Sequence, residues 1–159
     1  MKADLVVEAV YGHPVERVWA ALTSAEALAA WLMPNDFAPR VGHEFTFRTE
    51  PAPGFDGVVR CRVLELAPPT RMVWSWAGGP IDTTVTFALT PLADARTALH
   101  VRQFGFRGLG GQFTRLVLLR GSRQIYRRRL PAYLAGRPLP DPHAGHRHWP
   151  PHWLSGRRR

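Results

Sequence analysis

The sequence predicts an α+β fold in which a curved antiparallel sheet is wrapped around a long C-terminal helix. Three observations support this prediction. An apolar strand over residues 5–11 comes before two short helical segments. Residues 41–106 then alternate between apolar and polar side chains with the period of two that strands show. After residue 114 the chain becomes basic and helical in spacing. Its 159 residues are enough for one domain with a hydrophobic core.

The first helix is predicted from Pro14 to Leu22, directly after the strand of residues 5–11. Proline is tolerated at the first position of a helix because its missing N–H would be unpaired there anyway. The apolar positions repeat every three or four residues and are Val15, Val18, Trp19 and Leu22. One side of this helix is therefore expected to face the core.

The second helix is predicted to begin at Thr23-Ser24 and to end at Pro34. Glu26 lies three residues after Thr23, which is the spacing of a capping box. The apolar side of the helix consists of Leu28, Trp31 and Leu32. The expected order up to this point is strand, helix, helix.

The strands of the sheet are predicted from apolar residues at every second position, which point one face of each strand toward the core. The residues on this face are Phe45, Phe47, Val59, Cys61, Val63, Met72, Trp74, Trp76, Val85, Phe87, Leu89, Leu99 and Val101. Thr97 and Gln103 occupy the same face of the last strand. Short turns at 53–54, 68–69, 78–80 and 93–94 favour antiparallel neighbours. The many aromatic residues either fill a packed core or line a ligand cavity, and the sequence supports both interpretations.

The last helix is predicted from a stripe at helical spacing, formed by Leu116, Leu119, Arg123, Tyr126, Leu130, Tyr133 and Leu134. Gly121-Ser122 and Pro131 weaken a helix, so we expect it either to begin near Ser122 or to be kinked. Arg123 is the one charged residue of the stripe, and a buried guanidinium needs an anion. One hypothesis is that Arg123 and Gln103 orient a carboxylate or phosphate of a ligand. The alternative is that Arg123 extends its charged end to solvent.

The net charge of +9 is concentrated at the C-terminal end. Residues 1–114 carry ten Lys/Arg and eleven Asp/Glu, whereas residues 115–159 carry eleven arginines and one acid. The plainer interpretation is a solvated, arginine-rich helix face. The alternative is attraction of an anionic partner, either nucleic acid or an acidic membrane. Neither a zinc-finger spacing nor an RNA-recognition motif is present to favour nucleic acid.

We expect one domain over residues 1–136, followed by a disordered tail over residues 137–159 that is rich in Pro, His and Arg. The tail contains His143, His146, His148 and His152. Their spacing suits a transition metal, but a disordered segment does not fix ligand geometry, so no metal site is expected.

Several features favour the cytoplasm. No apolar run reaches the roughly 20 residues of a membrane-spanning helix, and the N-terminus does not resemble a secretory signal. Cys61 is the single cysteine, so no internal disulfide can form, and its place in a strand predicts a buried, reduced thiol. The sequence also lacks a phosphate-binding glycine loop, a nucleophile elbow and a zinc-protease motif, so we expect no cofactor and no catalytic residues.

A set of residues in a fixed order resembles the START-like helix-grip superfamily, also called SRPBCC. They are Pro14, Val18-Trp19, Leu22, Trp31, Gly42, Phe45, Pro68-Pro69, Arg71-Met72, Trp76, Thr97, Leu99 and Gly105-Phe106. The branch they resemble is the bacterial one related to the C-terminal domain of the activator of the heat-shock-protein-ninety ATPase. The resemblance covers residues 3–136. It implies a six- or seven-stranded antiparallel sheet that grips a C-terminal helix over an apolar cavity.

The resemblance implies a cavity lined by Trp31, Phe45, Phe47, Met72, Trp74, Trp76, Val85, Phe87, Leu99, Val101, Gln103, Phe106, Arg123, Tyr126 and Leu130. Members of the superfamily bind lipids, sterols or polyketides, so the expected function is non-enzymatic binding of an apolar or amphipathic small molecule. One alternative is a protein-interaction module that regulates a chaperone or other ATPase in the stress response, and another is a cyclase or hydrolase. The branch commonly has His where this chain has Gln103, and Gly-Trp where it has Ser122-Arg123.

Overall fold

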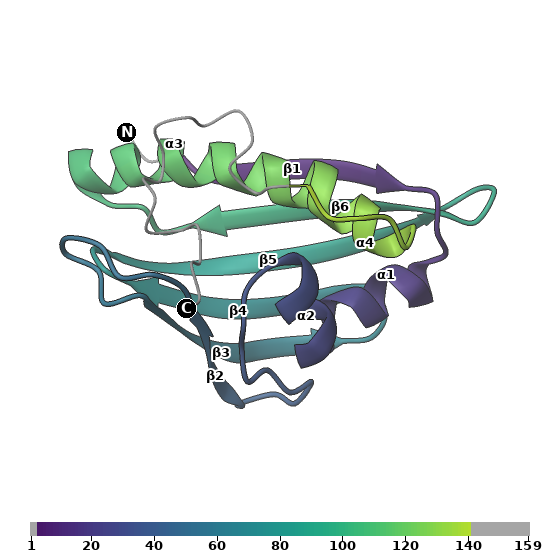
Figure 1. Ribbon diagram of the computed structural model, residues 1–159, viewed down its shortest axis with the longest axis horizontal. Coiled ribbons are helices and arrows are strands. Elements are labelled where there is room, and N and C mark those ends of the chain that lie inside the picture. Colours follow the sequence, from purple (N-terminus) through teal and green to yellow (C-terminus); the bar gives the residue numbers. More distant parts are fainter. Residues whose placement is uncertain (1–2, 141–159) are drawn as a thin grey trace.

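The computed structural model describes residues 3–140. Figure 1 shows one sheet with the helices lying against one of its faces. The strands are β1 (Leu5–Tyr11), β2 (Glu44–Arg48), β3 (Val58–Ala67), β4 (Arg71–Gly78), β5 (Ile81–Leu92) and β6 (Arg96–Phe104). The helical elements are α1 (Val15–Leu22), α2 (Ala25–Trp31), α3 (Gly108–Gln124), the π-helical turn η1 (Ile125–Arg129) and α4 (Leu130–Leu134). The histidines of the predicted tail lie outside the described residues.

The six strands form one antiparallel sheet in the order β1-β6-β5-β4-β3-β2. The predicted sheet, and the two short helices after its first strand, are therefore confirmed. The pairing aligns residues from neighbouring strands in rows across the sheet. One row runs from Leu5 through Gln103 and Val85 to Trp74 and Val63. Each of these side chains is buried. Residues that are paired across a sheet point to the same side, so the whole row lies on the face that meets the helices.

An aromatic cluster around Trp74 fills the part of the core that lies over β2, β3 and β4. The ring of Trp74 lies 4.6–5.7 Å, centroid to centroid, from the rings of Phe37, Phe45, Phe47 and Phe87. Trp31 of α2 lies on the helix side of this cluster, with its ring centroid 5.7 Å from that of Tyr126. Its indole N–H donates to the Ala21 carbonyl at 2.9 Å, which fixes α2 against α1.

Helix α2 is capped one residue later than the capping-box spacing predicts. The Ser24 hydroxyl accepts a hydrogen bond from the Ala27 amide at 3.2 Å. The Thr23 hydroxyl instead donates to the Trp19 carbonyl at 2.8 Å, at the end of α1. The predicted cap at Thr23-Ser24 is therefore confirmed at Ser24. The capping box of Thr23 with Glu26 was wrong, because the Thr23 hydroxyl is already engaged by the preceding helix.

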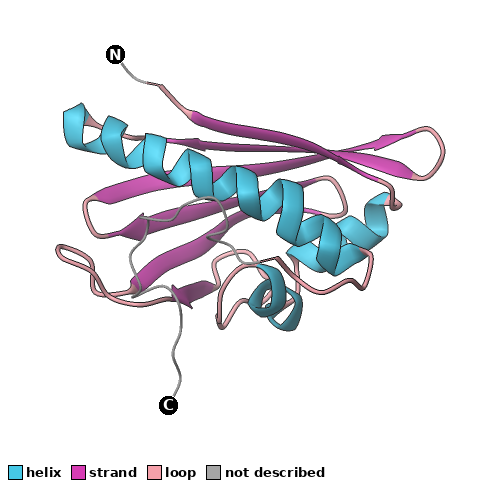
Figure 2. Ribbon diagram, turned by 45° about the horizontal axis from the view of Figure 1, so that its top comes forward, coloured by secondary structure: helices cyan, strands magenta, loops and turns pink. Residues whose placement is uncertain are grey.

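The C-terminal helix is continuous from Gly108 to Leu134 and crosses the sheet diagonally (Figure 2). It begins at Gly108, earlier than predicted, and it is interrupted by the π-helical turn η1. The predicted weak points, Gly121-Ser122 and Pro131, lie on either side of this turn. A π-turn holds one more residue than an α-turn, so it shifts the helix face that meets the sheet. The core-facing residues are Leu118, Leu119 and Ile125 before or at the start of this turn, and Tyr126, Leu130 and Leu134 from the turn onward. The predicted stripe is correct at Leu119 and from Tyr126 onward, but it placed Leu116 and Arg123 inward, and both are exposed.

Long polar side chains tie the end of this helix to the rest of the fold. The Arg17 guanidinium donates to the Leu134 carbonyl at 2.5 Å, at the C-terminal end of α4. Arg129 donates to the carbonyls of Trp31 at 3.0 Å and Ala30 at 3.2 Å, at the end of α2. Cationic side chains at helix C-termini satisfy carbonyls that have no partner within the helix. No helix within residues 3–140 is long and apolar enough to cross a membrane.

The fold predicts a loss of stability at alkaline pH. The Tyr11 hydroxyl donates to the Tyr126 carbonyl at 2.6 Å, within the π-turn. Burial raises the pKa of Tyr11 and of Tyr126 far above the ordinary value of 10.0, and burial likewise raises the pKa of the Cys61 thiol. The folded chain keeps these protons while the unfolded chain loses them, so stability is retained below the ordinary pKa values and falls as pH rises above them. The slope is about 1.4 kcal/mol per pH unit for each group.

Tyr11→Phe tests this expectation in urea unfolding experiments. At neutral pH the variant should lose about 1 kcal/mol, because the Tyr126 carbonyl loses its donor. Above pH 10 its stability should fall less steeply than that of the wild type, because one of the buried hydroxyls is gone. Equal slopes for the two proteins would contradict the burial argument.

Candidate functional site

The predicted cavity residues lie together on the helix-facing side of the sheet, with one exception. The residues within the buried core are Trp31, Phe45, Phe47, Met72, Trp74, Val85, Phe87, Leu99, Val101, Phe106, Tyr126 and Leu130. Trp76 packs against this core and is half-buried. Gln103 is also buried, with 6% of its surface exposed. The exception is Arg123, which is exposed on the far side of the C-terminal helix.

Gln103 and Thr83 form a polar pair within this apolar surface. The Thr83 hydroxyl donates to the Trp76 carbonyl at 2.9 Å, so its oxygen is left to accept. Gln103 Nε2 donates to that oxygen at 2.8 Å. These two bonds fix the orientation of the Gln103 amide, because only the NH₂ end can donate to Thr83. The amide oxygen Oε1 has no hydrogen bond from any described residue, so it is available as an acceptor.

Trp74 carries a second polar group without a partner. Its side chain is fully buried. Among the fully buried side-chain nitrogen and oxygen atoms of residues 3–140, only Trp74 Nε1 lacks a hydrogen bond. Leaving such a donor unpaired costs about 1–3 kcal/mol. Trp74 and Gln103 lie in the same row, separated by Val85 on the strand between them. Two strand spacings put their backbones about 10 Å apart.

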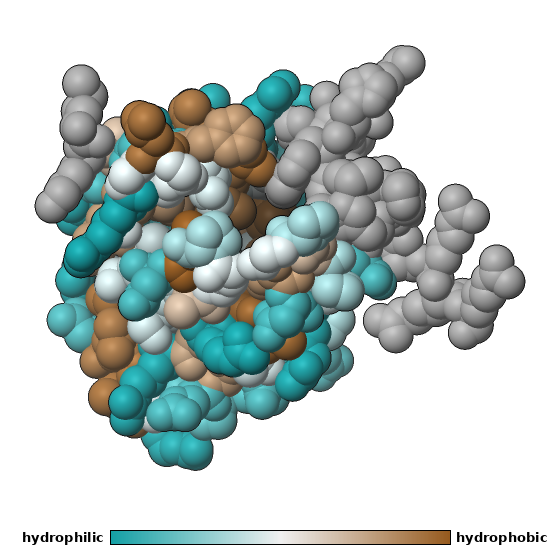
Figure 3. Space-filling model, turned by 90° about the vertical axis from the view of Figure 1, so that its left-hand side faces the viewer, coloured by the Kyte–Doolittle hydropathy of each residue, from teal (hydrophilic) through white to brown (hydrophobic). Residues whose placement is uncertain are grey.

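A pocket of about 320 Å³ opens where the sheet meets the start of α3. Its lining residues are Pro80, Ile81, Asp82, Gly105, Phe106, Arg107 and Gly111. Phe106 is buried and Ile81 packs against the core, so the pocket reaches the apolar interior. Figure 3 faces this end of the molecule. It shows hydrophobic side chains gathered at the top, over the start of α3.

The helix-facing side of the sheet, called the concave face below, has no buried charged side chain among the described residues. Its buried polar residues are Thr83, Thr97 and Gln103, and Thr97 is occupied by donating to the His13 carbonyl at 2.8 Å. Burial raises the pKa of the Cys61 thiol, which therefore stays protonated and poorly nucleophilic at neutral pH. No group of three or more potential metal ligands occurs within residues 3–140.

The sequence analysis missed Thr83 and the free N–H of Trp74. Thr83 is two residues before Val85, so it continues the alternation of β5, and extending that pattern by one step would have found it. The unpaired state of Trp74 Nε1 depends on which groups surround it in three dimensions, and no sequence pattern predicts this.

The fold and site define a START-like helix-grip domain, in which an antiparallel sheet encloses a C-terminal helix. The family model described as Activator of Hsp90 ATPase homolog 1-like protein matches residues 12–135. The chain therefore belongs to this family of Hsp90 ATPase activator homologues. A search of curated proteins gave no match.

Solved structures share the fold. A protein of Mesorhizobium loti is 33% identical, with a TM-score of 0.74, and the match covers 86% of this chain and 100% of that one. CalU16 of Micromonospora echinospora is 20% identical, with a TM-score of 0.71 and coverage of 87% and 78%. An Hsp90 activator of Plasmodium falciparum is 20% identical, with a TM-score of 0.53 and coverage of 64% and 71%.

Proposed function

We propose that this protein binds an apolar or amphipathic small molecule between the sheet and the C-terminal helix, without transforming it. The observation that carries the proposal is the pair of unpartnered polar groups, Gln103 Oε1 and Trp74 Nε1, on an otherwise apolar surface. Ligand pockets commonly combine an apolar lining with a few polar groups that fix orientation. The ligand would donate a hydrogen bond to Gln103, for example from a hydroxyl, and present an oxygen acceptor to Trp74.

The pocket at the start of α3 is the proposed entrance. The first half of α3 packs mainly against the edge strand β1, so it leaves the central strands less covered at this end. Trp76, which is half-buried on the helix-facing side, lies at this end of β4. A ligand enters by displacing the first half of α3 outward and reaches Gln103 before Trp74.

Binding is favoured over catalysis because the polar groups of the concave face do not titrate near neutral pH. Gln103 stands where related domains commonly have His, and an amide cannot act as a general base. A role as a protein-interaction module on a chaperone remains the alternative, and the likeness to the Plasmodium falciparum activator supports a shared fold only. The cytoplasmic location and a role in the stress response also stay predictions.

The first test is native mass spectrometry of the gently purified full-length chain, to detect a co-purified small molecule. Binding of fatty alcohols, sterols and hydroxylated aromatic polyketides is then measured by calorimetry. Each compound is compared with its methyl ether, which lacks the hydrogen-bond donor. We expect hydroxylated ligands to bind about tenfold more tightly than their ethers, as one hydrogen bond predicts.

Gln103→Leu should abolish this preference for the hydroxyl while it retains binding of the ether. The matched control is Thr97→Val, which removes another buried polar group from the same face of β6, six residues away. The control should keep the preference. The absence of any adduct, together with no binding by any compound of the panel, would overturn the proposal and direct attention to protein partners.

A further inference from the structure

The outward face of the C-terminal helix carries a two-part stripe, which is independent of the proposed ligand site. The α3 stripe consists of Leu109, Phe113, Leu116, Arg120, Arg123 and Arg127. The members from Leu109 to Arg123 are three or four residues apart in α3, so they share one helix face. Arg127 belongs to η1 and lines the same groove as Arg120 and Arg123. All six are exposed, with 93% of Leu109, 69% of Phe113 and 51% of Leu116 accessible to solvent. The stripe is apolar over its first half and cationic over its second, and about 27 Å long.

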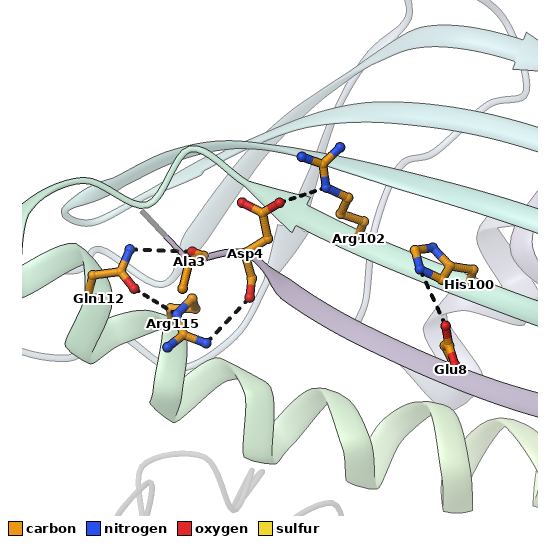
Figure 4. Close-up of polar contacts among 7 residues, drawn as sticks. All are labelled: Ala3, Asp4, Glu8, His100, Arg102, Gln112 and Arg115. Atoms are coloured by element: carbon orange, nitrogen blue, oxygen red, sulfur yellow. Dashed lines mark hydrogen bonds and ion pairs between the residues drawn. The ribbon is translucent and has the colours of Figure 1, made fainter. Parts of the chain in front are cut away.

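The opposite side of α3 is held by the edge of the sheet, so the stripe cannot turn inward (Figure 4). Gln112 Nε2 donates to the Ala3 carbonyl, and the Arg115 guanidinium donates to the Asp4 carbonyl, both at 3.4 Å. Arg115 Nε also donates to Gln112 Oε1 at 2.9 Å, which joins the two anchors. Gly111 of the same helix is buried against Phe106. The apolar half of the stripe therefore stays in water unless a partner covers it.

The cationic half borders a groove of about 750 Å³. The arginine groove is lined by Arg120, Arg123, Gln124, Arg127, Arg128, Pro131, Ala132, Arg137, Pro138 and Pro140. No acidic residue lines it, and none of its arginines takes part in the ion pairs found within residues 3–140. Arg127 Nε donates to the Glu8 carbonyl at 3.1 Å, which positions its guanidinium without neutralising the charge. The groove therefore concentrates positive charge for an anionic partner.

From this juxtaposition we propose that the α3 stripe docks on the surface of an anionic phospholipid membrane. The arginine groove contacts lipid phosphates, because a planar guanidinium group can donate two parallel hydrogen bonds to a pair of phosphate oxygens. Leu109 and Phe113 enter the boundary between headgroups and acyl chains, where a short apolar surface is stabilised without spanning the bilayer. A nucleic acid would satisfy the arginines but leave the apolar half in water. A lipid surface satisfies both halves, and this favours it.

The test is co-sedimentation of the full-length chain with vesicles of phosphatidylcholine alone and of phosphatidylcholine with phosphatidylglycerol in equal parts. We expect binding to the anionic vesicles and none to the neutral ones. Arg120→Gln/Arg123→Gln should weaken binding by about 25-fold, at about fivefold for each basic residue. Leu109→Ser/Phe113→Ser should weaken binding by at least about tenfold. All four positions are exposed, so thermal melting should show that these variants remain folded.

The matched control is Arg48→Gln/Arg62→Gln, which removes the same charge from exposed positions on β2 and β3. This control should bind anionic vesicles as the wild type does, because β2 and β3 lie at the edge of the sheet opposite β1, against which α3 packs. The C-terminal arginines are present in every variant and therefore do not affect the comparison. Failure of the wild type to bind anionic vesicles would overturn the proposal. So would an unchanged affinity of Leu109→Ser/Phe113→Ser, or binding to a DNA duplex at concentrations where vesicles are not bound.

Discussion

Trp74→Ala is expected to lower the free energy of unfolding by about 4 kcal/mol, because burial of this side chain organises the aromatic cluster. Large-to-small changes at fully buried aromatic positions lose the transfer free energy of the ring and leave a cavity. Trp74 is fully buried and contacts four aromatic rings, the nearest being Phe87 at 4.6 Å. Its N–H forms no hydrogen bond within the described residues, so none is lost, and removing this unpaired donor offsets part of the packing loss.

The same exchange at Trp76 is the matched control, since this residue lies on the same strand and the same face. Trp76 is half-buried and contacts the ring of Phe47 at 5.4 Å. Trp76→Ala should therefore cost well under half as much. Chemical denaturation of the three proteins measures both values. Equal losses for the two variants would show that the aromatic cluster is not centred on Trp74.

Gly57→Ala is expected to cost about 3 kcal/mol, although the residue lies in the loop between β2 and β3. Its φ is +81°, a conformation that costs an L-residue about 1–2 kcal/mol. An added Cβ would also lie 2.5 Å from the Thr49 carbonyl oxygen and 2.9 Å from the Pro51 nitrogen. Backbone atoms cannot rotate away as a side chain can, so the loop must shift. The Gly57 carbonyl also accepts from the Thr49 amide at 2.8 Å, a bond that such a shift would break.

Gly54 in the same loop separates the two causes. Its φ is +76°, close to that of Gly57, but no atom lies within 4 Å of an added Cβ. Gly54→Ala should cost only about 1 kcal/mol, from backbone strain. Thermal melting of both variants gives the comparison. Similar melting temperatures would show that the close contacts at Gly57 contribute nothing.

The sheet could be predicted from sequence because strand faces follow a local rule. Phe45, Phe47 and Phe87 are buried as the alternation indicated, since each is followed by a less buried residue on the other face of the sheet. The turns that join the strands are short, which left few alternatives to antiparallel pairing. Most of the candidate site shares this basis, because its lining consists mainly of the inward residues of these strands.

The phase of the C-terminal helix could not be predicted in the same way. Extrapolating from Tyr126 with a period of 3.6 places Arg123 and Leu116 inward, but the extra residue of the π-turn moves both to the surface. The residues of η1, Ile125–Arg129, carry no pattern that distinguishes a π-turn from an α-turn in the sequence. The orientation of Gln103 was likewise set by Thr83 and by the Trp76 carbonyl, two partners that meet it only in the folded chain.

The π-turn also determines how the surface of α3 responds to a change in chain length. A π-turn accommodates one extra residue with little change in the phase of the helix on either side, so deleting one residue within η1 would leave residues 108–124 facing as they do now. If the extra residue were instead wound into a regular α-helix, residues 108–124 would rotate by about 100° relative to the sheet, the angle that one residue subtends in an α-helix. Leu116 and Arg123 would then turn toward the sheet, and the outward row of residues would be dispersed. The exposed stripe thus depends on the backbone conformation of η1 as much as on the identity of its residues.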